Sequence, residues 1–122
     1  MNLLELKQQV MFQTGNDADD LGDFQPHLTD YLNEGYDRLM MAYVREHIGG
    51  DSDYPELGHD KSQPELPEWL HRAIADYATW LVYRNGSAEK QSRGFVFRKA
   101  FEEAEMKART FSAGKYITHI PM

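Results

Sequence analysis

The first side chains that could do chemistry form an acidic cluster near the N-terminus. The cluster comprises Asp17, Asp19 and Asp20. A calcium-binding loop needs oxygen ligands at positions one, three and five, a glycine at position six and a bidentate Glu at position twelve. Counted from Asp17, Gly22 fits, but Leu21 and Leu28 occupy positions five and twelve. Two ligands are missing, so we interpret residues 16–23 as a solvated acidic loop.

A second candidate is the E-x-x-H spacing of Glu68 and His71, which Glu56 and His59 repeat. A di-iron helical bundle needs two such pairs on helices, plus a Glu from each of two further helices. The Glu56–His59 pair lies in a Gly/Pro-rich segment, and we expect His71 at the polar edge of its helix. The sequence therefore predicts no metal site, with a metal-dependent helical enzyme built around His71 as the weakest alternative.

The remaining catalytic signatures are absent from the sequence. The chain has no cysteine, which excludes disulfides and a thiol nucleophile, and it contains no H-E-x-x-H, G-x-S-x-G or phosphate-binding glycine motif. Arg93, Arg98 and Lys99 lie near Phe95 and Phe97, a combination typical of single-strand stacking, but a solvated helix face explains it better. We expect a protein that is not an enzyme and has no cofactor.

Apolar periodicity predicts an all-α fold, a small bundle of about four helices in one domain. The helices run from an Asn2–Glu5 capping box to Gln13, from Pro26 to a Gly49–Gly50 stop, from Pro67 to Asn85, and from a Ser87 cap to Phe111. On the third helix, nine apolar residues cover an arc of about 200°, roughly twice what a surface helix needs. That helix is therefore expected at the centre of the bundle.

Two segments fall outside these helices. Residues 50–66 form a long acidic loop, and a connection of this length is functional or mobile. Residues 115–122 are predicted to be an extended C-terminal tail that follows a helical domain of residues 1–114. Its strand-like residues are Tyr116, Ile117, Thr118, His119 and Ile120. Because one strand leaves its own backbone groups unpaired, the tail must pair within the fold, dock on a partner or be disordered.

Charge and exposed apolar residues point towards association with other proteins. Residues 1–83 hold 16 acidic and 5 basic side chains, whereas residues 84–122 hold 4 acidic and 8 basic ones. Opposite charges attract copies of a chain head to tail, or else neutralise each other within one fold. Phe95 and Met106 fall on the side of the last helix opposite its apolar stripe, which predicts a contact surface.

No membrane segment or leader is evident in the sequence. The first five residues lack the basic start and long apolar run of a signal peptide. No apolar stretch approaches the roughly 18 residues that a transmembrane helix needs. We expect a cytosolic protein, or one released from the cytosol within a larger assembly.

Parts of three predicted helices resemble a known family. The run Asp30-Tyr31-Leu32-Asn33-Glu34-Gly35-Tyr36-Asp37-Arg38-Leu39 resembles a helix of the small head–tail connector (adaptor) proteins of tailed bacteriophages. The resemblance continues through Leu66-Pro67-Glu68-Trp69, Ala73-Ile74-Ala75-Asp76-Tyr77-Ala78 and Arg98-Lys99-Ala100-Phe101-Glu102-Glu103-Ala104, and so covers most of residues 3–111. The chain departs from the family at Gly35, where Ala is usual, and in the 50–66 loop.

The resemblance implies a non-enzymatic virion subunit that is assembled in the host cytoplasm. Such adaptors form a homo-oligomeric ring, such as a dodecamer, beneath the portal protein and dock the next connector or tail component. Double-stranded DNA passes through the ring without specific binding, and no membrane is involved. Acidic residues would face that DNA and let it slide, and for this role we take Asp17, Asp19, Asp20, Asp51 and Asp53.

The interface of such a ring would use the outer face of the last helix and the tail. These residues are Phe95, Met106, Tyr116, Ile117, Thr118, His119 and Ile120. The main alternative is a small bacterial helical interaction module, such as a regulator or an antitoxin-like protein. Both hypotheses require apolar side chains that only another protein covers.

Overall fold

The computed structural model describes residues 1–15, 25–45, 54–84 and 86–118. It contains the helices α1 (Leu3–Gln13), α3 (Leu28–Met40), α5 (Glu68–Arg84) and α6 (Ala88–Thr118). A 3-10 turn η1 (Gln25–His27) leads into α3, and a π-helical turn η2 (Met41–Arg45) follows it. The predicted all-α bundle of about four helices is confirmed, with no strand in the described part of the chain.

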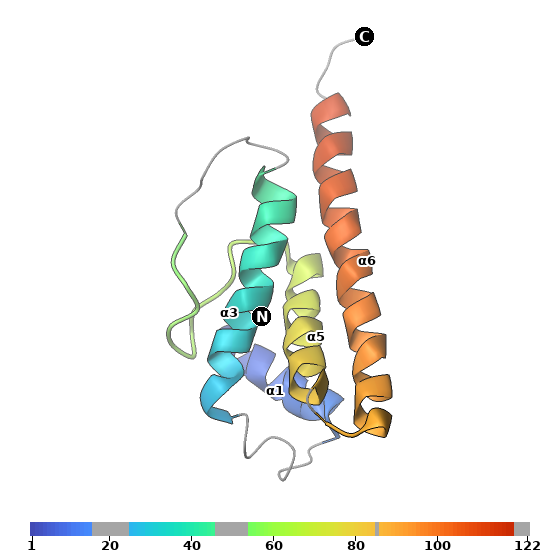
Figure 1. Cartoon of the computed structure of the whole chain (residues 1–122). Helices are drawn as coiled ribbons and strands as arrows, with labels where there is room; N and C mark the ends of the chain where they lie inside the picture. The colour runs from blue at the N-terminus through green and yellow to red at the C-terminus, as the bar shows by residue number, and fades with distance from the viewer. Residues whose placement is uncertain (16–24, 46–53, 85, 119–122) are drawn as a thin grey trace.

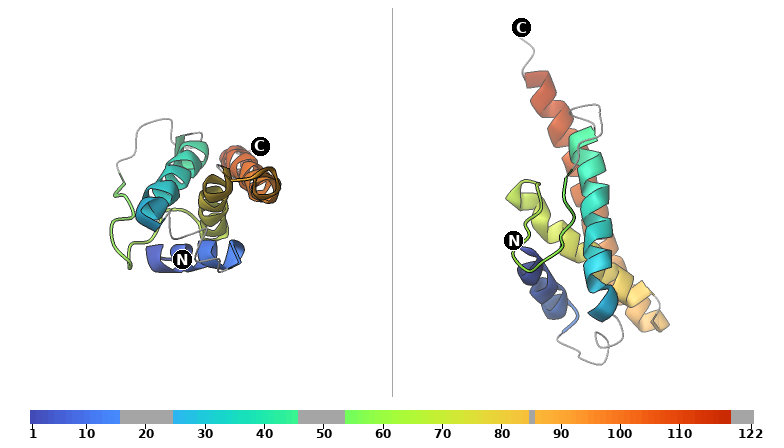
Figure 2. Two further views of the ribbon diagram at one scale, coloured as in Figure 1. Left: turned by 60° about the horizontal axis from the view of Figure 1, so that its bottom comes forward. Right: turned by 90° about the vertical axis from the view of Figure 1, so that its left-hand side faces the viewer.

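Helix α5 lies at the centre of the bundle, as its wide apolar arc predicts. Figures 1 and 2 show α3 and α6 on opposite sides of α5, with α1 crossing beside it. Twelve of its seventeen residues are buried, and they include the small residues Ala73, Ala75 and Ala78, which let the neighbouring helices approach. One predicted member of the arc, Trp69, is instead 46% exposed, although Leu70 and His71 in the same turn are buried.

Local capping explains where two of the helices begin. The Asn2 side chain accepts a hydrogen bond from the Glu5 amide at 2.8 Å, and the Glu5 carboxylate accepts one from the Asn2 amide at 3.0 Å. This is the predicted capping box, which satisfies two backbone donors at the start of α1. The hydroxyl of Ser87 accepts from the Lys90 amide at 3.3 Å and caps α6 in the same way.

The described part of the long loop packs tightly on α3. The Asn33 side chain accepts from the Leu57 amide at 2.8 Å and donates to the Leu57 carbonyl at 3.1 Å, and the Leu57 side chain is buried in the core. Further along, the Glu65 amide donates to the Tyr36 hydroxyl at 2.7 Å. The loop prediction therefore holds over 54–66, where side-chain bonds from α3 replace regular secondary structure.

The C-terminal segment differs from its prediction. Helix α6 runs through Gly114 to Thr118, so residues 115–118 are helical and the extended tail predicted for them is wrong. The expected domain boundary at residue 114 falls inside this helix. Each residue added to an existing helix gains one backbone hydrogen bond. One glycine in the helix costs only about 1 kcal/mol of stability, and the preference of a short β-branched run for a strand is weak. The rest of the predicted tail lies outside the described residues.

Arg38 bridges the two helices that flank α5. Its guanidinium donates to both carboxylate oxygens of Glu105 on α6, at 3.2 and 3.1 Å. The same group lies over the rings of Tyr77 and Phe101, at 5.5 and 5.0 Å from their centroids. A bidentate ion pair that also stacks on aromatic rings sets the orientation of both helices more strictly than a lone surface pair would.

Two glycines mark the closest approach of helices to α5. A Cβ atom added to Gly35 of α3 would lie 2.9 Å from the Cβ atom of Tyr77. A Cβ atom added to Gly94 of α6 would lie 2.8 Å from the Cβ atom of Tyr83. Both neighbours are atoms next to the α5 backbone, so neither can turn aside, and the absence of a side chain permits the packing at both points.

This packing predicts the effect of adding a methyl group at position 35. Gly35→Ala gains helix propensity of about 1 kcal/mol. The clash with Tyr77 should exceed that gain, because overpacking costs about 1–3 kcal/mol. We expect a net loss of unfolding free energy in urea titrations. The control Gly58→Ala has no atom closer than the Glu56 carbonyl at 4.0 Å and should change stability little; equal effects at both sites would contradict the close packing.

Candidate interaction surface

The outer face of α6 carries large apolar side chains that the rest of the described chain leaves uncovered. Phe95 is 60% exposed and Met106 is 67% exposed, in agreement with their predicted position opposite the packed side of the helix. They are eleven residues apart, which is close to three full turns, so they lie on one face. Val96, next to Phe95, is 67% exposed. Large exposed apolar side chains on one helix face, here with charged residues between them, are found at protein contact sites.

Arginine side chains organise this outer face. The guanidinium of Arg98 lies over the rings of Phe95 and Trp80, at 5.5 and 5.1 Å from their centroids, and its Nε donates to Glu102 at 2.9 Å. The guanidinium of Arg84 also lies over the Trp80 ring, 5.8 Å from its centroid. Stacked guanidinium groups keep their charge and lose little freedom when a partner binds. The face is therefore apolar, cationic and preorganised.

The remaining predicted interface and channel residues lie at the C-terminal end of α6 or outside the described residues. Tyr116, Ile117 and Thr118 belong to the last turn of α6. The other seven positions lie outside the described residues: His119, Ile120, Asp17, Asp19, Asp20, Asp51 and Asp53. Their proposed roles stay predictions.

A further apolar face was missed in the sequence. Leu4, Met11 and Phe12 are exposed on the side of α1 away from the core, and Phe12 is 71% exposed. The sequence could have indicated this face. Helix α1 is also apolar at Leu3, Leu6 and Val10, so it carries more apolar residues than one buried stripe requires.

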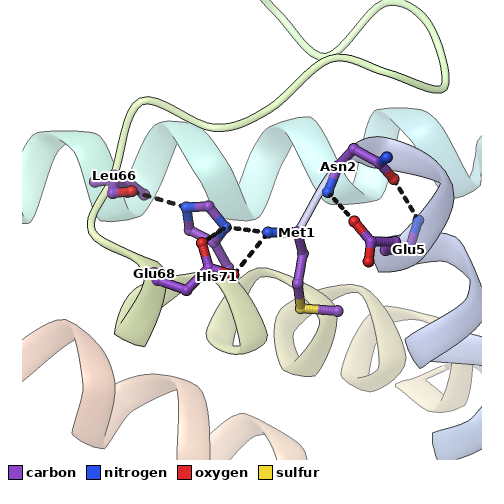
Figure 3. Close-up of polar contacts among 6 residues, drawn as sticks. All are labelled: Met1, Asn2, Glu5, Leu66, Glu68 and His71. Atoms are coloured by element: carbon purple, nitrogen blue, oxygen red, sulfur yellow. Dashed lines mark hydrogen bonds and ion pairs between the residues drawn. The ribbon is translucent and has the colours of Figure 1, made fainter.

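The E-x-x-H pair on α5 forms a polar cluster with the N-terminal residue (Figure 3). The α-amino group of Met1 lies 3.0 Å from a Glu68 carboxylate oxygen and 2.8 Å from His71 Nδ1. On the other side of the ring, His71 Nε2 lies 2.8 Å from the Leu66 carbonyl oxygen. The expectation that His71 lies at a polar edge is wrong: α1 and the loop before α5 cover it, leaving 3% exposed.

Both ring nitrogens of His71 are therefore engaged. The Leu66 carbonyl only accepts, so Nε2 carries the hydrogen and donates it, while Nδ1 accepts from the ammonium of Met1. Glu68 completes the arrangement at 3.4 Å from Nδ1. The second E-x-x-H pair, Glu56 and His59, lies apart in the loop. In residues that the structure describes, no group of three or more potential ligands is placed to hold a metal ion.

A second polar cluster joins the end of α1 to α5. The Gln13 side-chain amide donates to Asp76 at 2.7 Å, and its oxygen accepts from the Thr79 hydroxyl at 2.6 Å. Burial raises the pKa of the Asp76 carboxyl, while the Gln13 hydrogen bond and the nearby charge of Arg72 act in the opposite direction. A buried carboxyl with a raised pKa is a common feature of catalytic sites, but here its partners are structural.

Comparisons with known proteins do not assign the chain to a family. No protein-family model, curated protein or solved structure matches it. Among the described helices, none is long and apolar enough to cross a membrane. The surface chemistry and the packing are therefore the basis for a functional proposal.

The Asp76 environment predicts a specific pH dependence. Since the folded-state pKa lies above the unfolded value of 3.8, the ionised carboxylate is penalised in the folded state, and stability is lost as the pH rises from 3.8 through the folded pKa. Asp76→Asn keeps an oxygen acceptor for Gln13 and removes this penalty. We expect the variant to be the more stable protein at pH 7 in urea titrations, with the difference shrinking towards pH 3.8. An exposed control, Glu103→Gln, should show neither effect.

Removal of the His71 ring tests whether the E-x-x-H cluster is structural. His71→Leu leaves the Leu66 carbonyl without its donor, which should lower the unfolding free energy by about 1–3 kcal/mol. The exposed His59→Leu control should stay within about 0.5 kcal/mol of the parent. Elemental analysis of tag-free protein gives an independent readout: stoichiometric iron, zinc or manganese that disappears in His71→Leu would favour the metal-dependent enzyme.

Proposed function

We propose that this chain is a non-enzymatic subunit of a protein assembly, and specifically a head–tail connector (adaptor) of a tailed bacteriophage. The observation that carries the proposal is the outer face of α6, where Phe95, Val96 and Met106 are more than half exposed while the opposite side of the same helix packs on α5. Apolar surface removed from water contributes about 25 cal/mol per Å². A partner that covers this face would therefore gain substantial binding energy.

The proposed assembly is a ring of identical subunits beneath the portal protein. The balance of charge supports contacts between unlike surfaces, because residues 1–83 are strongly acidic and residues 84–122 are basic. Contacts between unlike surfaces generate a closed ring when the rotation between neighbours permits it. The ring would surround passing double-stranded DNA without binding it specifically, dock the next connector or tail component, and reside in the virion.

Within this proposal, two sets of residues keep the roles inferred from the sequence. The C-terminal set would contact a neighbouring subunit, and the acidic set would face the DNA path. The first set is Tyr116, Ile117, Thr118, His119 and Ile120, and the second is Asp17, Asp19, Asp20, Asp51 and Asp53. The negative charge of the acidic set would repel phosphate groups, which favours sliding over binding.

A small helical interaction module is the second candidate. It is favoured by the exposed apolar face of α1, with Leu4, Met11 and Phe12, because an amphipathic helix face commonly docks in a partner's apolar surface. This candidate predicts a discrete small oligomer or a single partner rather than a ring.

Two measurements separate these candidates. The gene neighbourhood should place the coding sequence just downstream of portal and capsid genes. The portal protein from that neighbourhood, mixed with this chain, should give a ring-on-ring complex in electron microscopy and light scattering. A small closed oligomer that leaves the portal unbound would contradict the adaptor proposal.

Substitutions on the outer face of α6 test the surface that carries the proposal. Phe95→Ser combined with Met106→Ser should weaken portal binding or self-association at least tenfold, which is about 1.4 kcal/mol. Because both side chains are exposed, the unfolding free energy should change by no more than about 0.5 kcal/mol per site. Glu103→Ser, on the same helix, is the matched control. Unchanged assembly in the double variant would rule out this face as the interface.

A further inference from the structure

A pocket of about 350 Å³ opens where the end of α1, the last turn of α5 and the first turns of α6 meet. Its apolar wall comes from Tyr83, Val96 and Phe97, and Arg93 lies at its rim. Pockets that hold a small ligand or an inserted side chain begin at about this size. Val96 belongs both to the exposed surface of α6 and to this pocket, whereas Phe95 and Met106 are not among the lining residues.

The polar groups around the pocket already have partners, so its floor offers apolar contact. The Gln13 side chain bonds to Asp76 and Thr79, and the Thr14 hydroxyl donates to the Val10 carbonyl at 2.9 Å. Arg93 also has a partner, but an exposed one. It donates to Glu89 at 3.0 Å but remains 63% exposed, and pairs of this kind on a surface are weak. The occupant that fits is an apolar side chain with a carboxylate beside it.

The positive charge around the pocket also favours an occupant that carries a carboxylate. Residues 84–99 contain five basic side chains and a single carboxylate, Glu89. The opposite balance occurs in residues 56–69, which contain four carboxylates and a single Lys or Arg, Lys61, and end at the exposed Trp69. Opposite patches on one chain favour contact between copies and set its register.

We propose that the pocket receives Trp69 from a second copy of the chain, with Glu65 of that copy facing the basic rim. The proposal rests on the proposed function insofar as both require self-association. Trp is the residue most often found at the energetic centre of an interface, where a pocket encloses it. Two exposed apolar residues follow carboxylates in the sequence: Met106, which belongs to α6 like the pocket's own Val96, and Trp69, which lies at the opposite end of α5 from the pocket.

The positions of Trp69, which we call the knob, and of the pocket that would receive it constrain how copies of the chain can assemble. Trp69 lies in the first turn of α5 and Tyr83 in its last, so the two surfaces are separated by about 21 Å along the helix at 1.5 Å per residue. Each copy therefore presents a knob at one end of α5 and a pocket at the other. If each copy inserts its knob into the pocket of the next copy, the contact can propagate to a closed ring. If two copies insert their knobs into each other's pockets, the contact closes a dimer.

Cross-linking between copies tests the contact directly, and the absence of native cysteine keeps the background clean. One copy carries Arg72→Cys, one turn from Trp69, and a second, isotope-labelled copy carries Ser92→Cys, one turn from Val96. Both positions are exposed. A short bis-maleimide should give the mixed cross-link identified by mass spectrometry. The matched control replaces Arg72→Cys with Asp30→Cys, an exposed position on α3, and should give at least tenfold less product.

Two further variants tie the product to the proposed chemistry. Trp69→Ala in the Arg72→Cys copy should lower the mixed cross-link at least tenfold at a temperature where its thermal unfolding curve shows the variant to be folded. Arg93→Glu in the pocket copy should also lower it, and Glu65→Arg in the knob copy should restore it. A mixed product no greater than the control, or one unaffected by Trp69→Ala, overturns the pocket contact.

The outcomes also separate this inference from the adaptor proposal. Ring assembly on a portal without the mixed cross-link leaves the adaptor proposal standing and removes the pocket contact. A closed dimer that gives the mixed cross-link but does not bind the portal supports the pocket contact and contradicts the adaptor proposal. Light scattering on the same samples distinguishes the two.

Discussion

The burial of α5 is the constraint on which the rest of the structure depends. Its apolar side chains cover more of its circumference than one neighbour can shield, so α1, α3 and α6 must all pack against it. The bare backbones of Gly35 and Gly94 allow α3 and α6 to approach it closely. Arg38, stacked on Tyr77 and paired with Glu105, then sets the relation between those two outer helices.

Helix α6 has more surface than is needed to cover α5, so part of it does not pack within the bundle. Helix α6 has 31 residues and α5 has 17, so α6 exceeds α5 in length by about 21 Å. Figure 1 shows its C-terminal turns projecting beyond the neighbouring helices. Only one side of α6 contacts α5, and the other side presents Phe95 and Met106 to the surroundings. A long helix with one packed side is well suited to join a domain to something else.

The polar clusters have a different role. His71 and Asp76 have features that are typical of catalytic residues: deep burial, charged neighbours and, for Asp76, a raised pKa. In each case the partners come from the N-terminal segment, through the Met1 amine just before α1 and Gln13 at its end. These hydrogen bonds attach both ends of the short helix α1 to α5. They fix its position more specifically than its apolar contacts alone would.

Local information in the sequence determined the helices, the Asn2–Glu5 and Ser87 caps and the exposure of Phe95 and Met106, because a 3.6-residue period and a cap depend on near neighbours alone. It did not determine the burial of His71 or the exposure of Trp69, since each depends on which distant segment covers that turn of α5. The helical state of residues 115–118 was also decided beyond local preference, because propensity differences among residues are smaller than the cooperative gain of extending an existing helix. The pocket formed by α1, α5 and α6 exists only in the tertiary structure, because its walls are far apart in the chain.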